Sequence, residues 1–261
     1  MILALKLLLA PVLIAVASLV TRRWGPRVGG WLVSLPLTST PVLIILALEQ
    51  GPAFSAAAAV GSLSGMAANA VFGVAYAYGA RPGPLWGMLI ASPIFLFAGA
   101  ALQPILGGQV WIITLIALAC ITLGLAVLPP RAAVVRPVRH PRWDIPARMV
   151  VAVILVFTLT TVAPLLGPEL SGLLATYPVY ASVMTTFTHR VAGLPSAIEL
   201  VRGHLTGIYG TVTFFLVLIV MLVPAGIAPS ILVAVGAALA TQAVAFRIAP
   251  GRRSRPAAGR V

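Results

Sequence analysis

The chain has 261 residues, of which 61% are hydrophobic and only 8% are charged, and its mean hydropathy is +1.10. Soluble domains do not reach such values, so the composition predicts an integral membrane protein. Seventeen basic and four acidic residues give a formal charge of +13, which indicates arginines at a cytoplasmic membrane surface and disfavours nucleic-acid binding. A single cysteine, Cys120, excludes a disulfide framework and a cysteine metal site.

Runs of about 19 to 25 mostly apolar residues are long enough to cross ~30 Å of hydrocarbon. In chain order they predict nine transmembrane helices, at residues 2–20, 28–48, 53–77, 85–103, 109–128, 148–166, 170–188, 196–222 and 228–247. Hairpins with Gly and Pro separate most of these helices. We therefore expect an all-α polytopic bundle without a soluble domain.

Basic residues in short loops are retained on the cytoplasmic side of a membrane. Fifteen of the seventeen basic residues lie in alternate connections or in the C-terminal tail: Arg22, Arg23, Arg27, Arg81, Arg131, Arg136, Arg139, Arg142, Arg148, Arg190, Arg247, Arg252, Arg253, Arg255 and Arg260. The opposite connections contain Glu49 and Glu169 but no Lys or Arg. This distribution predicts a multi-pass protein with its N-terminus outside and its C-terminus in the cytoplasm.

The chain also contains an internal repeat, because an offset of 142 aligns residues 5–73 with 147–215 without a gap. Thirteen positions are identical, and seven of them are helix breakers: Gly25/Gly167, Pro26/Pro168, Gly30/Gly172, Pro36/Pro178, Gly51/Gly193, Gly61/Gly203 and Gly65/Gly207. Because the offset spans five helices, the second copy would enter the membrane in the opposite direction. The expected organisation is a five-helix repeat (1–128), a basic cytoplasmic loop (129–147), an inverted four-helix repeat (148–247) and a basic tail (248–261).

Two matching segments, RVGGWLVSLPLTSTPVLIILALEQG (27–51) and SGLLATYPVYASVMTTFTHR (171–190), have a proline-centred second helix. Each segment resembles the small uncharacterised bacterial inner-membrane proteins of GlpM-like type, and the chain looks like two such units fused. The resemblance covers the first two or three helices of each half. It implies a bacterial inner-membrane protein and suggests transport, but it implies no substrate.

The second predicted helix is interrupted near its middle by Pro36 and Pro41 with hydroxyl residues between them. A proline inside a helix removes a backbone hydrogen bond and clashes with the preceding turn. Thr40 as N-cap and Pro41 as first residue would restart the helix and direct its positive dipole end at the membrane midplane. Pro178 marks the matching break in the seventh helix.

In an inverted repeat the two breaks would cross near the midplane, where many secondary transporters bind substrate. The expected substrate-binding residues are Pro36, Thr38, Ser39, Thr40, Pro41, Tyr177, Pro178, Tyr180 and Ser182. The alternative is that these prolines only kink helices for packing, with hydroxyls bonded to their own helix.

A second group of polar residues is a candidate for coupling or gating: Glu49, Asn69, His189, Glu199, Arg202 and His204. Charge inside a membrane usually faces a partner or water. Four of them also have a structural alternative: Arg202 is close enough to the interface to snorkel, Glu199 and Arg202 can neutralise each other, and Glu49 and His189 can cap helix ends.

The sequence contains no enzyme motif, so an enzyme, a metal and a cofactor are not expected. We predict a transporter-like protein for a small anionic or zwitterionic solute, or for a lipid head group, working by alternating access. The alternative is a non-transporting scaffold or accessory subunit of an envelope complex. Membrane lipids are the expected surroundings, and a homodimer or a partner membrane subunit stays open.

Overall fold

The structure is a computed structural model that describes residues 2–37, 39–106, 109–130, 141–162, 174 and 176–248, with side chains described except in 2–6 and 103–106. All regular elements in these ranges are α-helices. They are α1 (Ile2–Trp24), α2 (Pro26–Val33), α3 (Ser39–Glu49), α4 (Pro52–Gly79), α5 (Pro84–Leu106), α6 (Val110–Val127), α7 (Asp144–Val162), α9 (Val179–Ala225) and α10 (Ile227–Ile248). Each predicted span overlaps at least one of these helices, and the regular structure is all helical, which confirms the all-α class.

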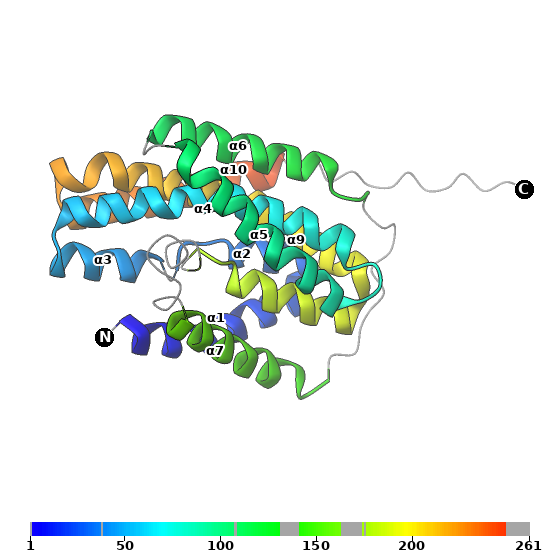
Figure 1. Cartoon of the computed structure of the whole chain (residues 1–261). Helices are drawn as coiled ribbons and strands as arrows, with labels where there is room; N and C mark the ends of the chain where they lie inside the picture. Colours follow the sequence, from blue (N-terminus) through cyan, green and yellow to red (C-terminus); the bar gives the residue numbers. More distant parts are fainter. Residues whose placement is uncertain are drawn as a thin grey trace, which may run out of the picture.

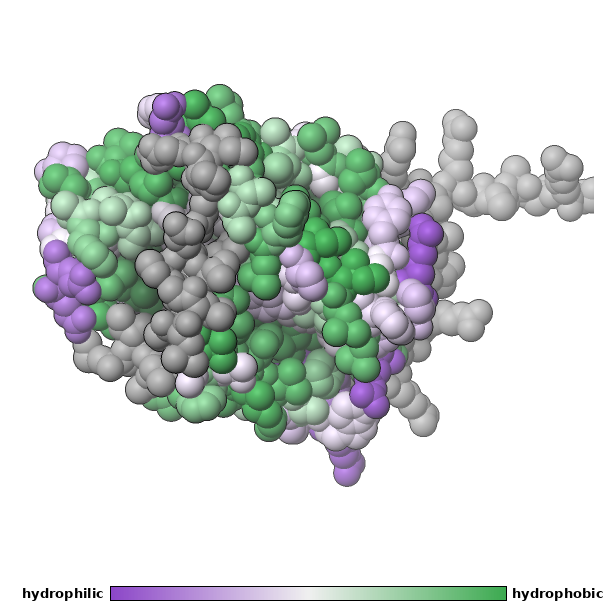
Figure 2. All heavy atoms as spheres, in the orientation of Figure 1, coloured by the Kyte–Doolittle hydropathy of each residue, from purple (hydrophilic) through white to green (hydrophobic). Residues whose placement is uncertain are grey.

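Seven of the described helices are long and apolar enough to cross a membrane. Large apolar side chains on their outer faces are widely exposed, for example Phe97 at 78% and Leu232 at 75%. In Figure 2 most of the surface between the two ends is hydrophobic, while hydrophilic residues gather at the ends. An apolar exterior of this kind is stable against lipid and costly against water, so the chain is a polytopic membrane protein.

Helix α9 has 47 residues, which at 1.5 Å per residue is roughly 70 Å, more than twice the thickness of the hydrocarbon core. It changes direction at Gly193, whose φ of 81° and ψ of 167° are non-helical. Only glycine adopts this conformation without strain. The chain therefore doubles back (Figure 1), so that α9 supplies the eighth predicted span and the part of the seventh from Val179 onward. Residues 170–173 and 175 of the seventh span lie outside the described residues.

Helices α2 and α3 together form the second predicted span, with 8 and 11 residues respectively. Neither is long enough to cross the membrane alone. Residues 34–37 between them are not helical, which confirms the predicted interruption. The restart is nevertheless earlier than expected: α3 begins at Ser39, so Thr40 is not its N-cap and Pro41 is not its first residue.

Helix α2 packs directly against the second half of α9. A side chain on Gly30 would overlap the carbonyl group of Leu200, and one on Gly203 would overlap the carbonyl oxygen of Arg27. Such glycines let two helix backbones touch, which is the usual way for helices to associate closely in a membrane. This contact holds the interrupted span against the middle of the bundle.

Helices α1 and α7 lie side by side and run in opposite directions (Figure 1). Helix α7 begins at Asp144, within the predicted loop 129–147, because the Asp144 carboxylate is paired with Arg148 and stabilises the first helical turn. The start of α1 and the end of α10 lie at opposite ends of the bundle.

Candidate functional site

The two predicted breaks have the same backbone turn. The N–H of Leu37 bonds to the carbonyl of Leu35 at 2.8 Å, and the N–H of Val179 bonds to the carbonyl of Tyr177, also at 2.8 Å. A bond of this spacing closes an inverse γ-turn, and the φ of −77° and ψ of 63° at Pro178 fit that turn. All of these positions match at the offset of 142.

A hydroxyl residue in the first turn of each restarted helix stabilises the turn before it, and the two residues match at the offset of 142. Thr40 Oγ1 donates to the carbonyl of Pro36 at 2.7 Å, and Ser182 Oγ donates to the carbonyl of Pro178 at 2.7 Å. Neither Thr40 nor Ser182 lines the cavity described below. For these two residues the packing alternative, in which a hydroxyl bonds back to its own helix, describes the geometry.

Each break lies against a helix of the other half of the chain. Ser34 Oγ occupies the space beside Gly207 of α9, and Thr176 Oγ1 occupies the space beside Gly65 of α4. Thr211 of α9 donates to the carbonyl of Ser34. In the matching bond, Asn69 Nδ2 of α4 donates to the carbonyl of Thr176 at 3.2 Å. Both the glycine contacts and the hydrogen bonds are related by the offset of 142.

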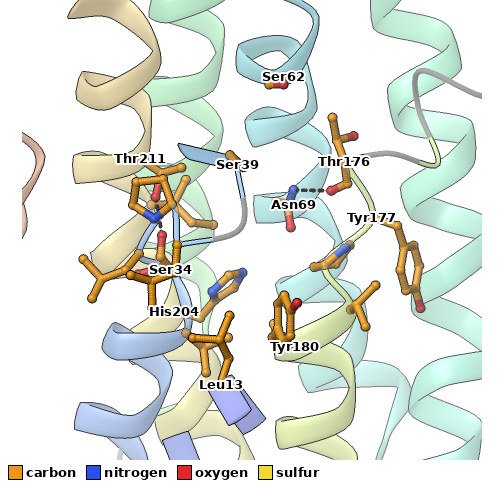
Figure 3. Close-up of a pocket in the computed structure, with 18 of the residues that line it drawn as sticks. Leu13, Ser34, Ser39, Ser62, Asn69, Thr176, Tyr177, Tyr180, His204 and Thr211 are labelled. Atoms are coloured by element: carbon orange, nitrogen blue, oxygen red, sulfur yellow. Dashed lines mark hydrogen bonds between the residues drawn. The ribbon is translucent and has the colours of Figure 1, made fainter. Parts of the chain in front are cut away.

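A cavity of about 330 Å³ lies where the two breaks approach each other (Figure 3). Its walls come from six helices, α1, α2, α3, α4, α7 and α9, and from the two turns. The polar residues that line it are Ser34, Ser39, Ser62, Asn69, Thr160, Thr176, Tyr177, Tyr180, His204 and Thr211. Leu13, Val16 and Ala17 of α1 and Val156 and Leu159 of α7 form an apolar wall. No Asp, Glu, Lys or Arg is among the described lining residues.

His204 is the most unusual residue of this cavity. It is 7% exposed, and neither ring nitrogen has a hydrogen-bond partner among the described residues. The imidazole points into the cavity, and Tyr180 lies on the other side of it (Figure 3). Its match in the first copy, Ser62, also lines the cavity.

Seven of the residues singled out from the sequence line the cavity: Pro36, Ser39, Asn69, Tyr177, Pro178, Tyr180 and His204. Tyr177 extends away from its centre (Figure 3), where its hydroxyl contacts Ser92 Oγ at 2.7 Å and its ring packs edge-on against Phe95. Pro41 is in the first turn of α3 and does not line the cavity. Thr38 lies outside the described residues.

The charged candidates do not reach the cavity. Arg202 Nε pairs with Glu199 Oε1 at 3.2 Å, and Arg202 Nη2 donates to the carbonyl of Pro129 at 2.7 Å. Arg202 therefore does not line the cavity, because the bond to Pro129 holds its guanidinium beside the end of α6. Mutual neutralisation of Glu199 and Arg202 is the alternative that the structure supports.

The proposed gate residues lie at helix ends. Glu49 is exposed at the end of α3. His189 precedes the reversal at Gly193 in α9, and its Nδ1 lies 3.3 Å from the hydroxyl of the buried Tyr76. Neither residue lines the cavity. His189 thus contacts α4 through Tyr76, whereas Glu49 lies at the exposed end of α3, away from the cavity.

Sequence reasoning missed the contribution of α1 and α7 to the walls, as well as Ser62, Thr160 and Thr211. The repeat alignment contained a signal for most of these residues. Ser62 matches His204, Asn69 matches Thr211, and Ala17 matches Leu159, so a lining residue in one copy indicates a lining residue in the other.

No family model, no curated protein and no solved structure matches this chain.

Proposed function

We propose that this protein is a transporter that carries a small solute across a bacterial inner membrane through the cavity between its two interrupted spans. The observation that supports this most strongly is the cavity itself, since matched positions of the two halves line it in pairs. Broken helices at equivalent places are a recurring feature of substrate sites in secondary transporters.

The proposal includes an inverted repeat. Its support is the set of contacts related by the offset of 142: two identical turns, two hydroxyls packed on glycines, and two hydrogen bonds to the carbonyls at the breaks. The opposite directions of α1 and α7, which match in the alignment, fit the same arrangement (Figure 1). In such a protein, one copy rocks against the other and exposes the shared site to each side in turn.

The proposed substrate is a small anionic or zwitterionic solute. A volume of about 330 Å³ is at the lower end of the range for small-molecule sites. The first turns of α3 and α9 both border the cavity, and helix N-termini favour negative charge. The GlpM-like resemblance and the arginine distribution support a location in the bacterial inner membrane with the N-terminus outside.

Alternating access is tested by thiol labelling in a Cys120→Ala background, since Cys120 is the single cysteine. Ser62→Cys places a thiol in the cavity wall. A membrane-impermeant thiol reagent should label it in right-side-out vesicles and also in inside-out vesicles, because a carrier opens its site to both sides.

The matched control is Leu115→Cys, at a position of α6 that is 67% exposed on the apolar surface and should be labelled from neither side. Labelling of Ser62→Cys from one side only would contradict alternating access. Labelling from neither side would favour the scaffold or accessory-subunit alternative.

A further inference from the structure

We infer that the cavity binds a monocarboxylate with an apolar body, and that His204 is the side chain that holds the carboxylate. This inference rests on the proposed function, because it assigns a ligand class to the same cavity. It is carried by the position of His204, the two helix N-termini and the composition of the walls.

A buried polar group without a partner destabilises the folded protein, so such groups are rare in the absence of a ligand. Both ring nitrogens of His204 are in this situation at 7% exposure of the residue. In every protonation state an imidazole has at least one N–H to donate. A ligand oxygen in the cavity would satisfy this donor, and a carboxylate oxygen is a strong acceptor.

The surroundings favour a single negative charge. Ser39 in the first turn of α3 and Ala181 in the first turn of α9 both line the cavity, and the two positions match in the repeat. The two helix N-termini therefore direct their positive ends at one space, each equivalent to roughly half an elementary charge. A cation would meet no carboxylate, and a doubly charged phosphate would meet no Arg or Lys, among the described lining residues.

The rest of the ligand is apolar, because α1 and α7 line the cavity mainly with aliphatic side chains. Leu13 and Val16 of α1 and Val156 of α7 form this apolar wall. Three of the lining hydroxyls, those of Ser34, Ser62 and Thr211, already donate to backbone carbonyls. A sugar would therefore find few partners here, whereas an aliphatic or aromatic acid would fit.

The test measures thermal stability of the detergent-purified full chain with benzoate, and with benzamide, benzylamine and phenylphosphonate as neutral, cationic and dianionic analogues. A ligand that binds only the folded state raises Tm by mass action. Benzoate should raise Tm and the three analogues should not. Oleate as a further arm distinguishes a dissolved acid from a carboxylate that arrives from the lipid.

Three variants assign the binding to His204. His204→Leu should weaken benzoate binding about tenfold or more, because a hydrogen bond to a charged group contributes that much. His204→Gln keeps an N–H donor and should bind benzoate more tightly than His204→Leu, which also covers the case that the leucine variant fails to fold. Ser64→Ala, at an exposed hydroxyl bonded to Gly61, should bind benzoate as the parent does.

No Tm shift with benzoate, an equal shift with benzamide, or unchanged benzoate binding in both His204 variants would overturn the inference. The outcome is separable from that of the proposed function. If Ser62→Cys is labelled from both sides and no carboxylate binds, the proposed transport by alternating access is supported and the assignment of a monocarboxylate ligand is wrong.

Discussion

Asp144 and Arg148 are the residues whose role depends most on the folded structure. The Asp144 carboxylate is completely buried, accepts a bond from Arg148 Nε at 2.9 Å, and lies 3.1 Å from Arg22 Nη2 of α1. Arg148 also donates to Thr188 of α9 at 3.4 Å. The ion pair of Arg22 with Asp144 and the hydrogen bond of Arg148 to Thr188 join α1, α7 and α9 at one end of the bundle. The sequence placed Asp144 in a basic loop, because nothing in a run of Pro and Arg shows which charge will be buried.

Asp144→Asn should destabilise the protein by about 3–5 kcal/mol, because it leaves the buried Arg148 without its counter-charge. Unfolding in detergent, by heat or by denaturant, measures the loss. Glu199→Gln is the control and should cost less, since the Glu199–Arg202 pair is partly exposed at 16% and 13%. Arg148→Met in the Asp144→Asn background should restore part of the stability. An Asp144→Asn variant as stable as the parent would refute the structural role.

At the scale of the element, glycines decide which helix faces touch. Gly203 and Gly61 match in the repeat alignment, yet they have different surroundings. A side chain at Gly203 would overlap Arg27 of α2, whereas nothing lies within 4 Å of the position at Gly61. Two helix backbones therefore pack closely at Gly203 and not at Gly61.

Gly203→Ala should therefore destabilise the bundle by about 1–3 kcal/mol, since α2 and α9 must separate to admit the methyl group. Gly61→Ala should be neutral or slightly stabilising, because alanine is the better helix former and has free space here. Thermal unfolding of the two variants side by side measures the difference. Equal effects would show that the α2–α9 contact does not limit stability.

At the scale of the whole molecule, the start of α1 and the end of α10 lie at opposite ends of the bundle (Figure 1). Nine predicted crossings, an odd number, require this arrangement. Hydropathy and breakers located these crossings from sequence, because both are properties of short segments. Which end faces the cytoplasm stays a prediction from the distribution of arginines.

Green fluorescent protein, which is fluorescent in the cytoplasm, should be fluorescent when fused after Val261. Alkaline phosphatase, which is active only in the periplasm, should be inactive at the same position. At the N-terminus the phosphatase should be active. Moving the basic residues Arg22 and Arg23 out of the first connection should weaken this bias, because retained positive charge sets orientation. Fluorescence at neither end, or at both, would contradict nine crossings.

The sequence by itself determined the membrane class, the crossings, the two proline breaks and the matching of the two halves, because each of these depends on local composition or on spacing along the chain. Only the tertiary structure decided which side chains face the cavity. Arg202 and His204 are two residues apart in α9, roughly 200° around the helix axis. His204 therefore points into the cavity while Arg202 bonds to Pro129. The rotation of a helix about its own axis is set by contacts with its neighbours, here by Gly203 and Gly207 against α2 and the turn that follows it. These contacts cannot be predicted from the sequence of the helix alone.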